Sequence, residues 1–175
     1  MHKLFIGIDP GKSGFITVYD SDSNDHVFAP MPKIGENIDV KGLADLFGII
    51  SHSGIIVHAV IEDVHAIYGS SASSTFTFGY VTGLLEMALV SNNIPFTKIQ
   101  PKTWQKQMWQ GVSLQQKSST TGKTMVTNTK VMSITAAKRL FPNIDLRRTS
   151  ACRVPDDNKV DSLLICEYCY KNFKR

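Results

Sequence analysis

The sequence predicts an α/β protein, a single domain over residues 1–175 in which helices flank a five-stranded mixed sheet. First, three short runs rich in β-branched and aromatic residues follow one another near the start, as in an antiparallel meander. Second, two later apolar runs alternate with segments of helical period, as in strands that join a sheet in parallel. Third, 175 residues with 42% hydrophobic and 19% charged side chains suffice for one core and not for two ordinary domains.

The expected strands are short apolar runs bounded by turn residues. The run at 55–61 is almost continuously apolar, which is typical of a central strand covered on both faces. The strands are expected at residues 3–9, 15–19, 26–29, 55–61 and 95–99.

The expected helices are segments whose apolar residues recur with helical spacing. Asp39 is placed to cap the first of them, and Pro101 to open the third. The helices are expected at residues 40–50, 74–91, 102–110, 129–140 and from Asp156-Asp157 to about Tyr170. Residues 111–128, rich in Ser, Thr, Gln and Lys, keep no apolar period and are expected to form a loop.

Charge is unevenly distributed along the chain. Residues 1–90 carry four lysines and ten acidic residues, a net of −6, whereas residues 91–175 carry fifteen basic and five acidic residues, a net of +10. This division fits a polyanion held by the basic half while carboxylates of the other half do chemistry. A solvated basic face is the alternative.

Several features indicate a cytoplasmic protein. No run of eighteen apolar residues predicts a membrane span, and the start lacks the features of a signal peptide. Three cysteines, an odd number, suit a reducing compartment. Cys166 and Cys169 form a CxxC without a second pair, so we expect them to line one face of the last helix and not to bind zinc.

Carboxylates stand at the ends of apolar elements. Asp9 and Glu62 follow two predicted strands, and Asp157 and Asp161, four residues apart, project from one face of the last helix. Carboxylates that meet out of water repel one another, and raised pKa values or a bound cation must relieve the cost. Ligands that are all oxygen suit Mg²⁺ or Mn²⁺, and two such ions serve phosphodiester hydrolysis.

Each of these acids also has a plainer interpretation. Asp9, before Pro10-Gly11, could be an Asx-turn residue, and Glu62 could be a surface residue at a strand end. Asp156 and Asp157 could cap the last helix and complement its dipole.

Six motifs, in order across almost the whole chain, resemble those of RuvC-type Holliday junction resolvases (crossover junction endodeoxyribonucleases), most closely the phage-encoded branch. They are Ile6-Gly-Ile-Asp9-Pro-Gly-Lys-Ser-Gly-Phe, Ile61-Glu62-Asp-Val-His65, Phe78-Gly-Tyr-Val-Thr-Gly83, Pro101-Lys-Thr-Trp-Gln-Lys106, Phe141-Pro142 and Asp157-Asn-Lys-Val-Asp161-Ser-Leu-Leu-Ile. The resemblance implies an RNase H-like nuclease domain that acts as a homodimer in the cytoplasm of a bacterial cell or a phage-infected host. It also implies two Mg²⁺ ions per site, replaceable by Mn²⁺, and paired symmetric nicks in a four-way DNA junction that leave 5′-phosphate and 3′-hydroxyl ends. No membrane or small-molecule substrate is implied.

The resemblance assigns catalytic and metal-binding roles to Asp9, Glu62 and Asp161, and a place near the scissile phosphate to Lys106. The fourth ligand is less clear, because the commoner spacing falls on Asn158. Asp157 is then the better candidate and Asp156 a possible substitute.

Further residues are expected to contact DNA, through an aromatic ring beside the opened crossover or through basic side chains along the backbone. They are His65, Tyr68, Phe76, Lys102, Lys117, Lys123, Lys130, Arg147 and Arg148. Core packing is the alternative for at least one of Phe76 and Phe78, and plain solvation for the lysines. Trp104 and Trp109 are expected in the core or an interface, and Gly79 and Gly83 offer the 74–91 helix a smooth face for close packing.

Two other function classes compete with a nuclease. Gly7 to Gly14 also resembles the first phosphate loop of actin-like ATPases and sugar kinases, although 175 residues cannot supply their second lobe. The basic half alone would suit a branched-DNA-binding module without catalysis.

Overall fold

A five-stranded sheet forms the centre of the structure, a computed structural model that describes residues 2–63, 71–119 and 121–174. The strand order is β3-β2-β1-β6-β7, in which β1, β2 and β3 form an antiparallel meander and β6 and β7 continue in parallel from β1. The strands are β1 (Lys3–Ile8), β2 (Phe15–Asp20), β3 (Asp25–Pro30), β6 (Ile55–Glu62) and β7 (Phe96–Ile99). The predicted five-stranded mixed sheet is confirmed.

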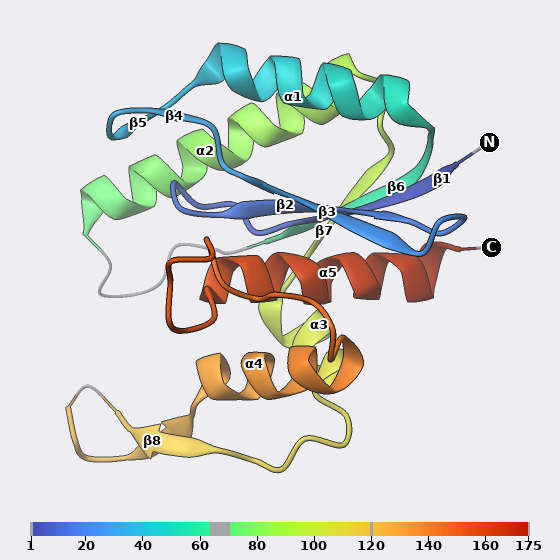
Figure 1. Ribbon diagram of the computed structural model, residues 1–175. Helices are drawn as coiled ribbons and strands as arrows, with labels where there is room; N and C mark the ends of the chain where they lie inside the picture. The colour runs from blue at the N-terminus through green and yellow to red at the C-terminus, as the bar shows by residue number, and fades with distance from the viewer. Residues whose placement is uncertain (1, 64–70, 120, 175) are drawn as a thin grey trace.

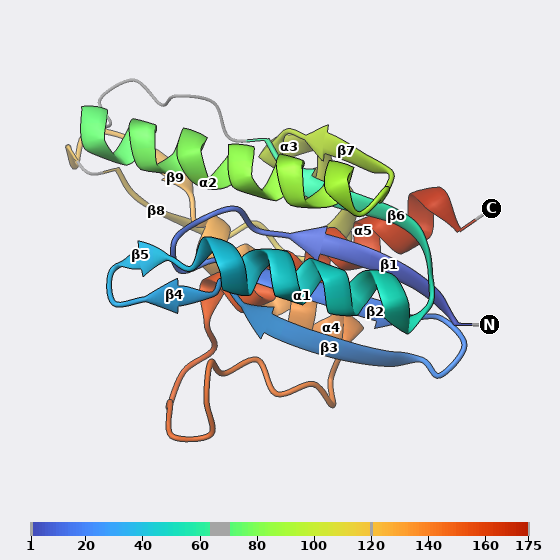
Figure 2. The ribbon, with the colours of Figure 1, turned by 90° about the horizontal axis from the view of Figure 1, so that it is seen from above.

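Helices cover both faces of the sheet. They are α1 (Val40–Ser53), α2 (Ala72–Ser91), α3 (Pro101–Met108), α4 (Thr129–Leu140) and α5 (Asp157–Phe173). Figure 1 shows α1 and α2 on one face and α5 on the other, with α3 and α4 beyond α5. Seen from above, α1 and α2 run across the sheet as neighbours (Figure 2).

The helix starts follow the predicted capping chemistry. The Asp39 carboxylate accepts the Gly42 amide at 2.9 Å, and Pro101 occupies the first turn of α3. The Asp156 carboxylate accepts the Lys159 amide at 3.0 Å and so caps α5. Each cap satisfies an amide that the helix itself cannot.

Strand β1 packs very closely against α5. A Cβ atom added at Gly7 would lie 2.2 Å from the Cys166 amide nitrogen and 2.4 Å from the Ser162 carbonyl oxygen, so only glycine fits there. Beside it, the hydroxyls of Thr17 and Ser162 share a buried hydrogen bond of 2.7 Å. The first turns of α5 are thereby fixed against the centre of the sheet.

Two hydrophobic cores fill the space on either side of the sheet. One lies beneath α1 and α2, and the other lies between the sheet and α3, α4 and α5. Cys166 and Cys169 are free thiols buried in the second core, which confirms that they line one face of the last helix.

Two short hairpins were not predicted. Residues 111–128, expected to be a loop, contain the antiparallel strands β8 (Gln116–Ser118) and β9 (Met125–Thr127). A second hairpin joins β4 (Lys33–Ile34) to β5 (Asn37–Ile38). Strands as exposed as β8 lack the alternation of buried and exposed residues that marks a strand in sequence. Of the helices in the described ranges, none is long and apolar enough to cross a membrane.

Candidate active site

Asp9 and Glu62 lie together at one edge of the sheet. Ile8 of β1 pairs with Ile61 of β6 in parallel, so the next residue of each strand is one of the two acids. The turn after Asp9 closes through main-chain bonds, from the Gly11 amide to the Asp9 carbonyl (3.2 Å) and from the Gly14 amide to the Gly11 carbonyl (2.9 Å). The turn therefore does not need the Asp9 carboxylate, which remains available at the sheet edge.

Asp161 reaches the same edge from α5. Burial raises the pKa of Asp9 well above its ordinary value, and the negative charges of Glu62, Asp161 and Asp156 raise it further. Burial also raises the pKa of Asp161, to about 7, against a hydrogen bond from Ser133 that lowers it, while Glu62 and Asp157 add repulsion. Acids from two strands and one helix thus lie close enough to repel one another.

Asp156 and Asp157 differ in the hydrogen bonds and ion pairs that their carboxylates make. The Asp156 carboxylate caps α5 and accepts a 2.6 Å bond from Arg148. Burial acts to raise the pKa of Asp156, but these hydrogen bonds outweigh it and leave the pKa lowered. Asp157 is ion-paired with Lys130 through one oxygen, while its Oδ1 is buried without a hydrogen-bond partner. Of the two, Asp157 has the free oxygen.

The donor set fits a divalent cation. The buried Oδ1 atoms of Asp157 and Asp161 have no hydrogen-bond partner, and the pKa of Glu62 is also raised by burial, against a lowering bond from Trp104. Clustered carboxylate oxygens of this kind suit Mg²⁺ or Mn²⁺. Within the described part of the chain, no three His, Cys, Asp or Glu side chains yet stand as a preformed metal site.

The predicted DNA-contact residues fall into four groups, one of which is the pair of arginines Arg147 and Arg148. Lys102, Lys106, Lys117 and Lys123 are exposed, and Phe76 is 76% exposed, which removes core packing as its role. Lys130, predicted on the DNA surface, lies at the carboxylates through its ion pair with Asp157. His65 and Tyr68 lie outside the described residues.

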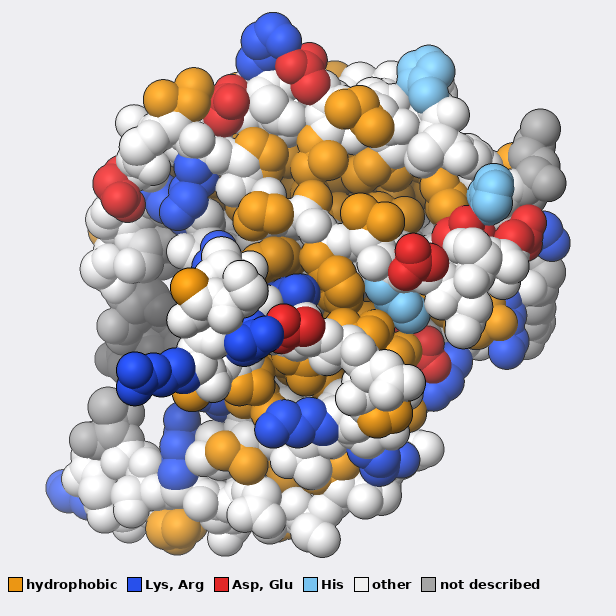
Figure 3. Space-filling view, in the orientation of Figure 1, with side chains coloured by type: hydrophobic (Ala, Val, Ile, Leu, Met, Phe, Trp, Pro, Cys, Tyr) orange, Lys and Arg blue, Asp and Glu red, His pale blue; other side chains and the backbone are white. Residues whose placement is uncertain are grey.

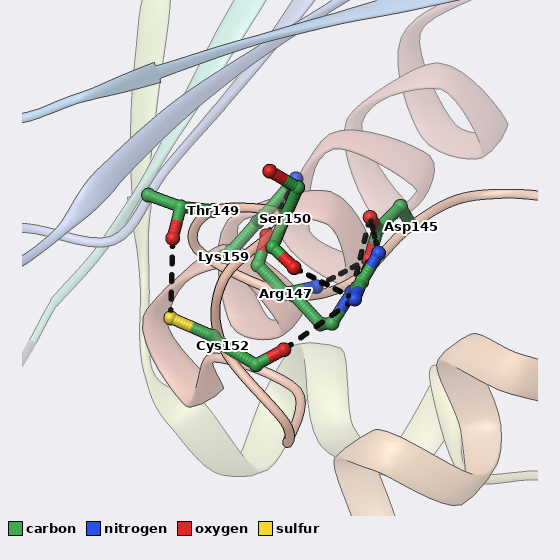
Figure 4. Close-up of polar contacts among 6 residues, drawn as sticks. All are labelled: Asp145, Arg147, Thr149, Ser150, Cys152 and Lys159. Carbon is green, nitrogen blue, oxygen red and sulfur yellow. Dashed lines mark hydrogen bonds and ion pairs between the residues drawn. The ribbon is translucent and has the colours of Figure 1, made fainter.

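Arg147 and Arg148 are engaged within the chain. Figure 4 shows the Arg147 guanidinium bonded to the Asp145 carboxylate (2.8 Å) and to the Ser150 carbonyl (3.0 Å), so it holds the loop between α4 and α5 in shape. Arg148 also donates to the Ser13 carbonyl at 2.6 Å and lies over the Phe15 ring. Arg148 thereby ties the start of α5 to the turn that follows Asp9.

Many basic side chains of residues 91–175 lie on one part of the surface. In Figure 3 the Lys and Arg side chains are concentrated in the lower left of the view, over the loop before α5, α4 and the β8–β9 hairpin. Most acidic side chains on this face lie above or to the right. Two basic side chains lie at the acids themselves, because Arg148 donates to the turn after Asp9 and Lys130 is ion-paired with Asp157. Positive charge in this place is suited to a phosphate backbone.

Without divalent cations, wild-type protein is expected to lose stability relative to Asp161→Asn as pH rises from about 4 to 8. The pKa of Asp161 is raised from 3.8 to about 7, so the folded state keeps a proton that the unfolded state releases. The stability from this proton is complete below the unfolded pKa and is lost as pH passes the folded pKa. Asparagine does not titrate. Urea unfolding in EDTA at pH 5 and pH 8 measures the difference, and a difference that does not change with pH would contradict the expectation.

Comparisons with known proteins give a match in structure only. No protein-family model matches the sequence, and no curated protein matches it. The fold is similar to Thermus thermophilus RuvC in complex with a Holliday junction substrate, at a TM-score of 0.58 and 12% identity over 97% of this chain and 95% of that chain. Another Thermus thermophilus RuvC structure gives a TM-score of 0.57 and 12% identity, over 99% and 97% of the two chains. The predicted RNase H-like fold of the RuvC type is confirmed, whereas affinity to the phage-encoded branch stays a prediction.

Proposed function

We propose that this protein is a metal-dependent endonuclease that resolves four-way DNA junctions by paired symmetric nicks. The observation that carries the proposal is the meeting of Asp9, Glu62 and Asp161 at one sheet edge, beside a basic surface. The same fold occurs in a RuvC protein bound to a Holliday junction. We place this activity in the cytoplasm.

The proposed chemistry is phosphodiester hydrolysis that leaves 5′-phosphate and 3′-hydroxyl ends. Asp9, Glu62, Asp157 and Asp161 would hold two Mg²⁺ ions, or Mn²⁺ in their place, which activate water and stabilise the leaving oxygen. To serve as a ligand, Asp157 must exchange its ion pair with Lys130 for the cation, which frees this lysine for a phosphate.

Basic and aromatic side chains would position the DNA. The exposed Lys102, Lys106, Lys117 and Lys123 would supply cations for the backbone, with Lys106 near the scissile phosphate as the resemblance implies. Phe76 lines a small hollow together with Lys12, which belongs to the turn after Asp9, and its exposed ring would stack on a base at the opened crossover.

We further propose that two copies associate through α2. One face of α2 has residues at spacings of three and four, the pattern of a coiled-coil seam: Tyr80, Gly83, Met87 and Val90. The side chains of Tyr80, Met87 and Val90 are 47%, 61% and 57% exposed. Gly79 and Gly83, expected to aid close packing, have nothing within 4 Å of an added Cβ, so a second helix can approach there. A dimer supplies two active sites for opposite strands.

Met87→Lys is expected to raise the dimer dissociation constant by about 30-fold or more, because an unpaired charge would enter an apolar seam. Sedimentation velocity across a concentration series measures it. Ile49→Lys is the matched control, since Ile49 is 69% exposed on α1. Equal effects of the two variants, or no effect of Met87→Lys, would argue against this seam.

The proposed function is tested by incubating the protein with a synthetic four-way junction and Mg²⁺, beside a linear duplex of the same sequence. We expect symmetric nicks in the junction, ends that DNA ligase can reseal, and an intact linear duplex. Junction binding without nicking would instead favour a binding module without catalysis.

A further inference from the structure

Beneath the acids lies a buried layer from α3 and α4, two helices that carry none of the proposed metal ligands. Trp104 of α3 is fully buried, and its indole nitrogen donates to Glu62 Oε1 at 2.8 Å. An indole has one N–H and cannot accept, so its only polar group is committed to this carboxylate.

Ser133 of α4 plays the matching part for Asp161. Its hydroxyl is buried, accepts the Trp109 indole N–H at 3.3 Å and hydrogen-bonds Asp161. A hydroxyl can accept one hydrogen bond and donate another, so Ser133 can accept from Trp109 while it donates its one hydrogen to the carboxylate. The two indole rings also meet edge to face, with centroids 6.3 Å apart at 77°. Edge-to-face rings resist sliding and join the two supports into one unit.

We propose that Trp104 and Ser133 are positioning residues that fix the Glu62 and Asp161 carboxylates for a divalent cation, and that Trp109 holds Ser133 in its donating orientation. This inference rests on the proposed function and deepens it. The sequence alone suggested only core or interface roles for the two tryptophans.

The chemistry of the donors separates this layer from ordinary ion pairing. Both donors are neutral, so they orient a carboxylate and leave its charge for a cation. Lys130, by contrast, opposes a cation at Asp157 with its own charge. The hydrogen bond from Ser133 also leaves Asp161 Oδ1 without a hydrogen-bond partner. Such outer contacts typically change metal affinity by about 10- to 100-fold.

The test measures Mn²⁺ binding by calorimetry, without DNA, in wild type, W104F, W109F and S133A. W104F removes the donor to Glu62 and keeps an aromatic ring, and we expect its Mn²⁺ dissociation constant to rise about 10-fold or more. S133A should show a similar loss. W109F removes a comparable volume but leaves the Ser133 hydroxyl in place, so its loss should be smaller. Junction binding in EDTA should match wild type in all three variants, because no DNA-facing group is changed.

The outcomes separate the inference from the function on which it rests. If wild type binds Mn²⁺ and W104F binds it equally well, the positioning role is wrong and the nuclease proposal stands. If W104F and W109F lose affinity equally, in proportion to a loss of melting temperature, the role is packing alone and the inference also fails. If wild type binds no Mn²⁺, the positioning role and the metal-dependent nuclease proposal are both wrong. The chain has two tryptophans, so W109F leaves Trp104 as the only indole, and the tryptophan emission of this variant must change on Mn²⁺ addition.

Discussion

Asp9→Asn is expected to lower junction cleavage by about 1,000-fold or more and to leave junction binding in place. The carboxylate lies at the meeting point of β1, β6 and α5, where burial and three neighbouring acids raise its pKa. An amide of the same shape cannot supply the negative charge that holds a cation. Losing about 4 kcal/mol of transition-state stabilisation corresponds to that change in rate. Single-turnover cleavage in Mg²⁺ and gel-shift binding in EDTA measure the two properties separately.

The control for Asp9→Asn is Asp22→Asn, which removes one negative charge from the exposed turn between β2 and β3. Its cleavage rate should match wild type. If Asp9→Asn lost binding in step with cleavage, Asp9 would be acting in DNA contact or folding and not in catalysis. In EDTA at pH 8 the Asp9→Asn protein should also unfold at a higher urea concentration than wild type, because it buries one fewer charge.

Gly7→Ala is expected to destabilise the protein by about 3 kcal/mol or more. The added methyl would lie 2.2 Å from the Cys166 nitrogen and 2.4 Å from the Ser162 oxygen, both main-chain atoms of α5. No side-chain rotation relieves such a contact, so α5 must move from β1 and take Asp161 with it. Urea unfolding measures the loss, and cleavage should fall even where the protein remains folded.

Gly48→Ala is the matched control for Gly7→Ala. Gly48 lies within α1, and a Cβ added there meets nothing within 4 Å. Alanine favours helix over glycine, so this variant should be more stable than wild type by about 0.5–1 kcal/mol. A Gly7→Ala protein as stable as wild type would show that the contact between β1 and α5 is looser than described.

The sequence predicts the parts of the site that depend on one strand at a time. Asp9 and Glu62 could be found because an apolar run ending on an acid is a local signal, and the parallel pairing of Ile8 with Ile61 brings the two together. The last helix and its cap could also be predicted, because helical spacing of apolar residues and an acid at the helix start are local signals too. The roles of the individual site residues stay predictions.

Other parts of the site depend on contacts that no local pattern reports. Asp156 and Asp157 are adjacent acids at a helix start, and what distinguishes them is the cap that Asp156 forms and their different partners, Arg148 and Lys130. The link from Trp104 to Glu62 spans 42 positions and depends on how α3 packs. The β8–β9 hairpin was missed because a strand with no core to face need not alternate.

The contact of α5 with Gly7 bears on how the protein matures during synthesis. Strand β1 is made before its partner helix α5, which spans Asp157–Phe173 and follows more than a hundred residues later. Contacts this distant in sequence form late, and domains emerge from the N-terminal side. The growing chain therefore carries Asp9 and Glu62 before Asp161 has been made. Under the proposed function, the chain could cleave DNA only after the last helix has packed against the sheet.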